Sequence, residues 1–275
     1  LLPGVQHMRH THLPEHKFVK GEPETGVEMA EDLERIAMNF GGENIAACII
    51  EPIAGSTGTL VPPKGYLKRI KEICDKHGIL LIFDEVITGW GRTGSAFAAQ
   101  EWKVTPDIMT MAKATTNGVV PMGVVAVKEE IYDAVLDASS APEGTPELFH
   151  GYTYSGIPVA VAAALAVQDI FDKEDLINRA KEMSPYFQDG LHSLKDLKEV
   201  VSIRGYGMMG GIEINMKEKP GKAGYQVFKH CYDAGVNFKN TGDNLIIAPQ
   251  FICEKKHIDE IIEKLRTGIS NYSKS

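Results

Sequence analysis

The feature that most constrains the fold is an unbroken apolar run at residues 79–83, which ends at a carboxylate, Asp84. Five consecutive apolar residues are typical of a parallel strand that is buried on both faces. A carboxylate directly after such a strand costs free energy unless a cation or hydrogen-bond donors compensate it. Asp84 is therefore either a functional anion or a helix cap or structural ion-pair partner, and its position alone does not decide between them.

The residues before 169 alternate between helical and strand periods. This alternation predicts βαβ units and an α/β fold, in which a mainly parallel central sheet carries helices on both faces. A glycine, Gly78, follows the second helical stretch and predicts its end. We expect helices at 29–40 and 64–77, and strands at 45–50, 79–83, 107–111 and 123–127.

The pattern changes after an Ala/Val-rich helical stretch at 158–171, which is long enough to connect two lobes. We expect residues 1–168 to form part of a large domain, which includes this helix. Residues 169–275 are expected to form a smaller C-terminal α+β domain. Its predicted elements are helices at 174–194, 222–234 and 255–272, a hairpin of strands 200–204 and 208–214 around Gly205-Tyr206-Gly207, and a strand at 245–248.

Composition excludes several classes of protein. The net charge of -8 and pI near 5.6 disfavour nucleic-acid binding, which usually requires a basic surface. No stretch approaches the roughly 20 apolar residues of a membrane span. The four cysteines lie far apart without a CxxC pair, which indicates reduced, mostly buried thiols in a reducing compartment such as the cytoplasm.

Two local patterns suggest sites that we do not expect. Histidines at 7, 10, 12 and 16 lie in a loop-like segment without recurrent ligand spacing, so we expect a solvated loop and no metal site. Residues 89–94 match the dinucleotide pattern G-x-G-x-x-G, but residues 84–88 separate them from the strand. A tight turn that needs small residues is the favoured interpretation.

Lys113 follows the apolar stretch 107–111 and enters a polar loop. A lysine there is either a surface residue or a nucleophile with a lowered pKa. Together with Asp84 it changes the interpretation, because pyridoxal 5′-phosphate chemistry requires a lysine amine and a carboxylate for the pyridine nitrogen.

The combined motifs resemble the class III aminotransferases of the fold-type I pyridoxal-phosphate superfamily. The resemblance covers essentially the whole chain and points to the ω-amino acid:pyruvate subgroup, which includes β-alanine:pyruvate and taurine:pyruvate enzymes. The residues that carry it are Asp84-Glu85-Val86, Gly89-x-Gly91-Arg92-x-Gly94, Pro106-Asp107, Ala112-Lys113, Glu51-Pro52, Thr116-Asn117-Gly118-x-x-Pro121-Met122-Gly123 and the segment 150–156.

The resemblance implies a role for each of five residues. Lys113 forms a Schiff base with the cofactor and moves protons, and Asp84 pairs with the pyridine nitrogen. Val86 packs on one ring face, and Thr153 binds the cofactor phosphate of the neighbouring subunit, which implies a homodimer or a tetramer. Glu51 lies near the substrate. For Val86 and Glu51, core packing and a strand-end cap remain the alternatives.

The implied activity is amino transfer from an ω-amino acid or amine to a keto acid, with pyruvate as the expected acceptor. Another class III activity, such as a diamine or ornithine-type aminotransferase or an aminomutase, is an alternative. So is a truncated, inactive chain, because relatives extend well over a hundred residues before Leu1. The expected missing part carries a phosphate loop and a ring-stacking aromatic residue, so we expect poor cofactor binding by residues 1–275 alone.

Three positions depart from the family pattern. Lys239 stands where many relatives carry an arginine that binds a substrate carboxylate, and lysine lacks the bidentate fork. This departure leaves room for a sulfonate or a simple amine as substrate. Ile157 replaces a common histidine before Pro158, and Pro249-Gln250 replaces a common Pro-Pro.

Overall fold

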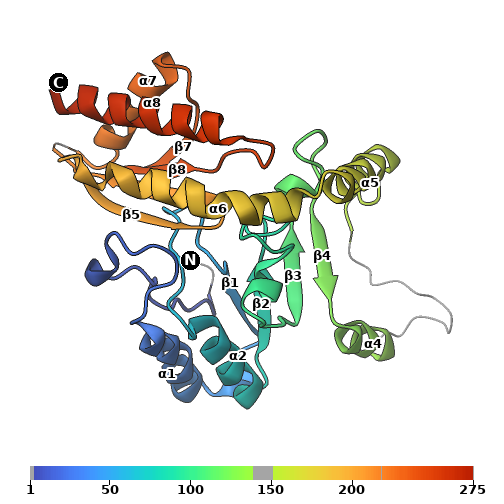
Figure 1. The fold of residues 1–275 in the computed structure, drawn as a ribbon. Coiled ribbons are helices and arrows are strands. Elements are labelled where there is room, and N and C mark those ends of the chain that lie inside the picture. Colours follow the sequence, from blue (N-terminus) through green and yellow to red (C-terminus); the bar gives the residue numbers. More distant parts are fainter. Residues whose placement is uncertain (1–2, 139–150, 218, 275) are drawn as a thin grey trace.

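The computed structural model describes residues 3–138, 151–217 and 219–274, which form two four-stranded sheets (Figure 1). The first sheet has the order β1-β2-β3-β4, in which β1, β2 and β3 are parallel and β4 is antiparallel. The predicted α/β fold with a mainly parallel sheet is confirmed. Its elements are α1 (Glu31–Phe40), β1 (Ala47–Ile50), α2 (Tyr66–His77), β2 (Leu80–Asp84), α3 (Ala98–Glu101), β3 (Ile108–Met111), β4 (Val124–Val127) and α4 (Glu129–Asp137).

Burial alternates along β2. Leu81 and Phe83 are fully buried in the core beneath α1 and α2, whereas Leu80 and Ile82 on the opposite face are only partly buried. Ile49, the partner of Ile82 on β1, is 61% exposed. The prediction that this strand is buried on both faces is therefore wrong for the described residues, because they cover only one face of the sheet.

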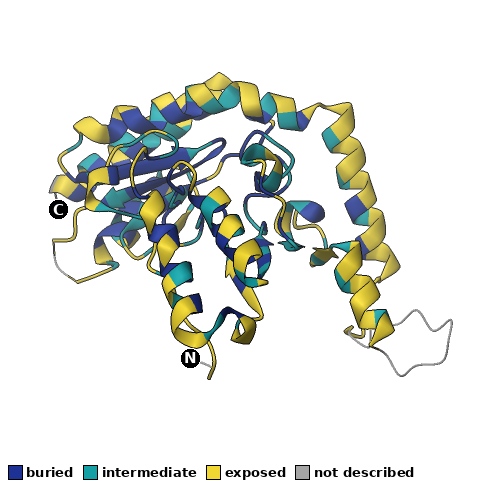
Figure 2. Cartoon of the chain, turned by 90° about the horizontal axis from the view of Figure 1, so that it is seen from below, coloured by how far each residue is buried: buried dark blue, intermediate teal, exposed yellow. Residues whose placement is uncertain are grey.

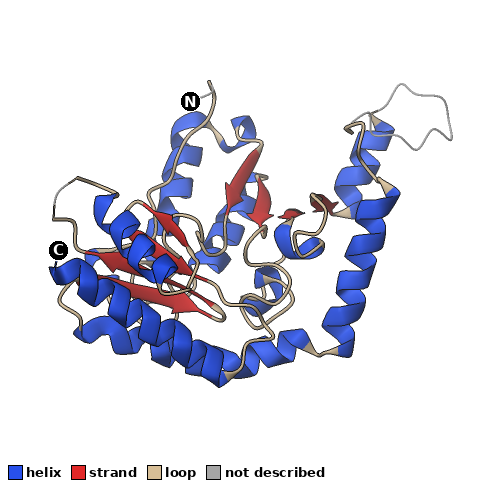
Figure 3. Ribbon diagram, turned by 90° about the horizontal axis from the view of Figure 1, so that it is seen from above, coloured by secondary structure: helices blue, strands red, loops and turns tan. Residues whose placement is uncertain are grey.

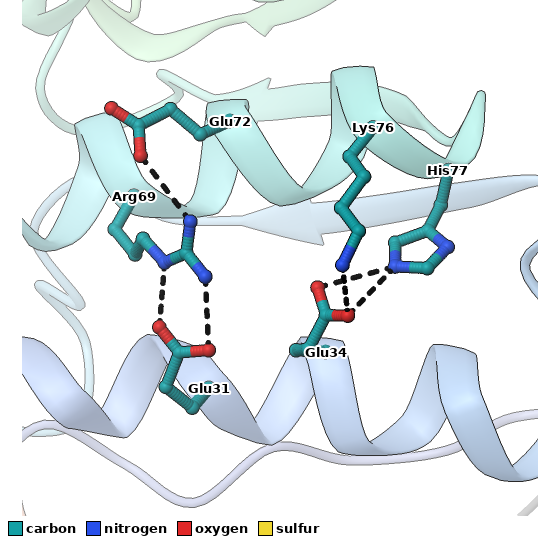
Figure 4. Close-up of polar contacts among 6 residues, drawn as sticks. All are labelled: Glu31, Glu34, Arg69, Glu72, Lys76 and His77. Carbon is teal, nitrogen blue, oxygen red and sulfur yellow. Dashed lines mark hydrogen bonds and ion pairs between the residues drawn. The ribbon is translucent and has the colours of Figure 1, made fainter.

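Helices α1 and α2 lie side by side and are joined by ion pairs (Figure 4). Arg69 donates to both Glu31 oxygens at 2.5 and 3.1 Å, and Lys76 and His77 contact Glu34 at 2.5 and 3.1 Å. Exposed ion pairs contribute at most about 1 kcal/mol each, so apolar burial beneath them contributes most of the stability. The buried apolar residues of the two helices are Leu33, Ala37, Tyr66, Leu67, Ile70, Ile73 and Cys74.

The second sheet is antiparallel, with the order β5-β6-β8-β7. Figure 3 shows helices packed around its strands, and side chains from α6, α7 and α8 fill the core between them. We call these elements the second lobe. They are α6 (Leu176–His192), β5 (Val200–Tyr206), β6 (Met209–Ile214), α7 (Lys222–Asp233), β7 (Lys239–Thr241), β8 (Asn244–Ile247) and α8 (Lys255–Lys274).

The hairpin between β5 and β6 turns later than expected. Gly205 pairs with Gly210 within the sheet, so the turn is at Gly207 and Met208. A Cβ on Gly205 would lie 2.2 Å from Oε1 of Gln188 on α6. The absence of a side chain at Gly205 thus allows the helix to pack closely on the strand. The prediction of a turn at 205–207 is wrong for its first two residues, which belong to β5, and correct for Gly207.

Helix α5 (Pro158–Lys173) connects the two sheets. Most of its length is exposed, and only Ala160 and Ala164 are buried (Figure 2). The predicted domain boundary after residue 168 falls inside this helix, and the division into domains stays a prediction. No described helix is long and apolar enough to cross a membrane. Short 3-10 helices complete the described chain at Pro14–His16, Val27–Ala30, Gly42–Asn44, Lys113–Thr115 and Ser193–Asp196.

Candidate active site

Three charged side chains meet at the carboxyl edge of the first sheet. Glu51 directly follows β1, Asp84 ends β2, and Lys113 comes two residues after the end of β3. Because these three strands are parallel, their carboxyl ends lie at one edge, where open α/β sheets bind ligands. The sheet therefore brings together residues that are 62 positions apart in the sequence.

The second lobe contributes a fourth charge, Lys239, the first residue of β7. Its Nζ donates to the Ser56 hydroxyl at 3.2 Å, in the loop that follows β1. Lys239 also acts electrostatically on Glu51 and Lys113. The site is therefore assembled from both lobes, and Ser56 is a member that the sequence did not indicate.

Lys113 and Glu51 have shifted pKa values. Burial lowers the pKa of the Lys113 amine, and Lys239 lowers it further, against the opposing effects of Asp84 and Glu51. Burial also raises the pKa of Glu51, and the nearby Asp84 carboxylate adds to that shift. The Lys113 side chain is nevertheless exposed, so a ligand can reach its amine. A lysine with a lowered pKa has the properties of a nucleophile or a base.

The backbone at Lys113 is strained. Its φ is +44°, a left-handed conformation that costs a residue with a side chain about 1–3 kcal/mol. The residue begins the 3-10 turn Lys113–Thr115, and its carbonyl accepts the N–H of Gly118 at 3.3 Å. Such strain persists only where surrounding contacts hold it, and it is typical of functional positions.

Asp84 is half-buried, and its Oδ1 accepts the Val86 N–H at 3.1 Å. Val86 is itself half-buried beside it, which is compatible both with ring packing and with its alternative, core packing. A reachable amine and a carboxylate at the same sheet edge are the two groups that pyridoxal phosphate needs from a protein. The residues present therefore fit the cofactor.

Thr153 lies apart from this group. It is exposed in the turn before α5, and among the described residues no hydrogen bond or electrostatic contact joins it to Lys113. His150, from the same segment, falls outside the described residues. The other two departures are explained in part: Ile157 precedes α5 as its N-cap, and the Pro249 carbonyl accepts Arg92 Nη1 at 2.7 Å.

Residues 89–94 do not form a dinucleotide site. Strand β2 has ended at Asp84 and α3 begins only at Ala98, so the segment lacks the strand–turn–helix geometry of that motif. Of the histidines near the start, His16 has defined contacts. His16 is buried against the carbonyls of Thr11 and Thr25, and the described residues contain no cluster of three or more candidate metal ligands.

A mainly parallel sheet with an amine and a carboxylate at its carboxyl edge is the arrangement found in pyridoxal-phosphate-dependent transferases. Comparisons with known proteins agree. The sequence matches the class-III aminotransferase family over residues 2–269. The chain belongs to the class III aminotransferases, a family that depends on pyridoxal phosphate.

The chain is also similar to individual members of this family. The chain is 50% identical over 268 residues to an omega-aminotransferase of Caulobacter vibrioides, covering 97% of this chain and 60% of that protein. It is 43% identical to an omega-amino acid–pyruvate aminotransferase of Pseudomonas putida, covering 95% of this chain and 59% of that protein. An omega transaminase structure from Pseudomonas jessenii in complex with PMP superposes with a TM-score of 0.91 at 30% identity, covering 100% and 62%. The chain thus spans about 60% of the length of these relatives.

Proposed function

We propose that the protein containing this chain transfers an amino group from an ω-amino acid or amine to a keto acid, with pyruvate as the acceptor. The observation that carries the proposal is the meeting of Lys113, Asp84, Glu51 and Lys239 at one sheet edge. Relatives named for ω-amino acid–pyruvate and β-alanine–pyruvate aminotransfer support the substrate class.

Lys113 is the residue that binds the cofactor covalently and moves protons. Because burial lowers the pKa of its amine, a larger fraction is neutral near pH 7 than for an ordinary lysine. A neutral Nζ has the lone pair needed to take a proton from the substrate carbon. The same Nζ, once protonated, can return the proton to a different carbon.

Asp84 would hold the pyridine nitrogen of the cofactor. Its carboxylate stabilises a protonated pyridine nitrogen, and Val86 beside it supplies an apolar contact for the ring face. When bound, pyridoxal phosphate supplies a ring that accepts the electrons released as the substrate C–H bond breaks. The role of Asp84 is to keep that ring electron-poor throughout.

Lys239 and Glu51 face the substrate. The Lys239 ammonium is a point charge on a flexible stem, so it can bind a carboxylate or a sulfonate without demanding bidentate geometry. The Ser56 hydroxyl accepts a hydrogen bond from Nζ. Glu51, whose pKa is raised by burial, offers a partner for an amine-bearing substrate that lacks an acidic group. This pair accommodates both ω-amino acids and simple amines.

The same proposal includes a homodimer, or a tetramer built from it, in which Thr153 binds the cofactor phosphate of the partner subunit. Large exposed apolar side chains beside this segment support an interface. Tyr152 and Tyr154 are 80% and 79% exposed, and Leu165 on α5 is 60% exposed. Replacing Thr153 with valine should weaken cofactor binding without changing the mass of the oligomer, measured by light scattering.

A reducing compartment such as the cytoplasm is also proposed. All four cysteines are buried as free thiols, which supports an environment without disulfide formation.

Lys113→Ala tests the function directly, in the protein expressed from its whole gene. We expect the visible absorbance of the bound cofactor to change and β-alanine:pyruvate activity to fall by at least about 10⁴-fold, because one amine both binds and moves protons. Lys68→Ala is the matched control, since Lys68 is an exposed lysine of α2 away from the site. Unchanged activity in Lys113→Ala would disprove the assignment.

The acceptor is tested separately by alanine or glutamate formation from pyruvate or 2-oxoglutarate. We expect pyruvate to be the better acceptor with β-alanine as donor. A strong preference for 2-oxoglutarate would overturn the substrate class and leave the role of Lys113 intact. An inactive wild-type protein with normal folding would instead support the interpretation of the chain as an inactive scaffold.

A further inference from the structure

The glycine-rich segment 89–94 has no role in the function proposed above, yet its conformation is unusual. Trp90 has a φ of +63°, which is rare for a residue with a large side chain. The N–H groups of Trp90 and Gly91 both donate to the Ala96 carbonyl, at 2.6 and 3.2 Å. The backbone thereby closes a tight loop that presents the indole of Trp90 in a fixed direction.

That indole connects to the Lys113 turn. Trp90 Nε1 donates to the Thr115 hydroxyl at 3.0 Å, and this hydroxyl lies 3.0 Å from the Ala112 carbonyl. An indole N–H can only donate, so the threonine oxygen accepts it and gives its own hydrogen to Ala112. The Ala112 carbonyl also accepts the Thr115 backbone N–H at 3.0 Å, and it belongs to the peptide unit before Lys113, whose φ is left-handed.

Aromatic contacts hold the indole itself. The Trp90 ring meets Phe97 edge-on at a centroid distance of 5.2 Å and Phe171 of α5 at 6.4 Å. Thr115, the last residue of the Lys113–Thr115 turn, is itself buried. The hydrogen-bonded chain is therefore shielded from water, which strengthens it and makes the loss of either partner costly.

The other side of the same segment contacts the second lobe. The Arg92 guanidinium donates to the carbonyls of Met208 and Pro249 at 2.8 and 2.7 Å and lies 4.3 Å from the ring centre of Phe251. The Met208 N–H returns a bond to the Arg92 carbonyl at 2.9 Å. Pro249 follows β8, the strand paired with the one that carries Lys239.

We propose that Trp90 and Thr115 are positioning residues for Lys113, and that the 89–94 turn holds the Lys113 turn in register with the second lobe. The inference rests on the proposed role of Lys113 as the cofactor lysine. The turn therefore contacts both parts of the site. The Trp90 indole fixes the peptide before Lys113, and Arg92 binds the second lobe, which carries Lys239.

Loss of the indole N–H has a specific consequence. Thr115 loses a donor, its hydroxyl is free to reorient, and the constraint on the Ala112 peptide weakens. The strained Lys113 backbone then relaxes toward ordinary φ values, which moves Nζ away from its burial and from Asp84. Since burial is the main cause that lowers the pKa of this amine, the pKa should rise toward that of an ordinary lysine.

Three substitutions separate hydrogen bonding from packing. Trp90→Phe keeps an aromatic ring but removes the N–H, and Thr115→Val keeps the shape but removes the hydroxyl. Thr115→Ser keeps the hydroxyl and is the conservative rescue. Trp102→Phe is the matched control, because the Trp102 indole also donates to a side chain, Glu22 Oε1 at 2.7 Å, away from Lys113.

The measurement is the pH dependence of Lys113 acetylation by acetic anhydride, followed by mass spectrometry, in the whole-gene protein stripped of cofactor. We expect Trp90→Phe and Thr115→Val each to raise the amine pKa by about half a unit or more. The reconstituted variants should lose about tenfold in kcat with KM for the amine changed less than twofold, because positioning of the amine is affected and substrate binding is not. Thr115→Ser and Trp102→Phe should resemble the wild type in both measurements.

The double variant Trp90→Phe/Thr115→Val should be no worse than either single variant, because both break one hydrogen-bonded chain. Additive effects, or a Lys113 pKa in Trp90→Phe equal to that in Trp102→Phe, would overturn the inference. If Trp90→Phe does not fold, the Thr115 pair decides alone. Failure of the proposed function is a separate result: Lys113→Ala would stay active, whatever the acetylation of the wild-type amine shows.

Discussion

The two sheets of this chain differ in how far they are enclosed and in how many site residues they carry. The second sheet is enclosed by α6, α7 and α8 around a single core, and its strand β6 is buried along almost its whole length. The first sheet is enclosed on one face only among the described residues, and Ile49 and Val125 on the other face are more than 60% exposed. Yet the first sheet carries three of the four charges of the candidate site. The candidate site therefore lies mainly at the less enclosed sheet, and the well-enclosed lobe contributes one cation, Lys239.

The difference follows from the direction of the strands. Parallel strands bring their carboxyl ends to one edge, so side chains from distant positions converge there. Antiparallel strands distribute their ends over both edges, and the second sheet accordingly places only Lys239 in the site. Substitutions in the two sheets should therefore affect different properties: activity in the first and stability in the second.

The largest expected effect comes from a charge removed at the carboxyl edge of the first sheet. Asp84→Asn should lower kcat/KM by about 10³-fold with little change in unfolding, because a neutral amide no longer stabilises the cationic ring nitrogen. Asp107→Asn is the matched control at the start of β3, where the carboxylate binds Lys128 and the Leu81 N–H. A similar activity loss in both variants would contradict the special role of the carboxyl edge.

A core substitution in the second lobe should rank next. Phe187 of α6 is fully buried, so Phe187→Ala should lower the free energy of unfolding by about 3–5 kcal/mol. Ile49→Ala on the open face of the first sheet should change it by no more than about 0.5 kcal/mol. Urea unfolding of both variants measures the contrast, and equal losses would show that the open face is covered in the whole protein.

Acid should weaken the second lobe through a buried histidine. Burial lowers the pKa of His192 to about 4, and among the described residues its Nε2 has no hydrogen-bond partner. Between about pH 4 and 6.5 the unfolded chain therefore binds a proton that the folded chain does not, so stability rises with pH across this window. The contribution is about 3 kcal/mol. Urea unfolding at several pH values should show a smaller slope for His192→Gln, and an identical slope would exclude this histidine.

The smallest effect should come from the cation that the second lobe supplies. Lys239→Met should raise KM for β-alanine about tenfold, corresponding to one lost charge contact, and should leave KM for a simple alkylamine unchanged. Ser56→Ala should shift KM in the same direction but less, because it only loosens the Lys239 amine. Steady-state kinetics with both donors distinguishes them. Equal changes in KM for the acidic and the neutral donor would show that Lys239 does not bind the acidic group of the substrate.

Local patterns predicted much of this protein. The apolar run before Asp84, the stretch before Lys113 and the alternation of helices with strands were sufficient for the α/β fold and for two candidate cofactor residues. These patterns could be read from the sequence because the end of a strand and a polar residue directly after it depend only on neighbouring residues. A short pattern misled where distant packing decided the structure. The glycines around 205 suggested a turn, but Gly205 lies in a strand and packs against Gln188 of α6.

The sequence by itself determined the class of fold, the family, and the positions of Asp84 and Lys113 at strand ends. Only the tertiary structure decided which distant groups surround them. Lys239 meets Ser56 across 183 residues, and Trp90 meets Thr115 across 25. The burial of one sheet face and the exposure of the other were likewise decided at that level. Such contacts depend on how whole elements pack, and no local period in the sequence encodes which loop faces which strand end.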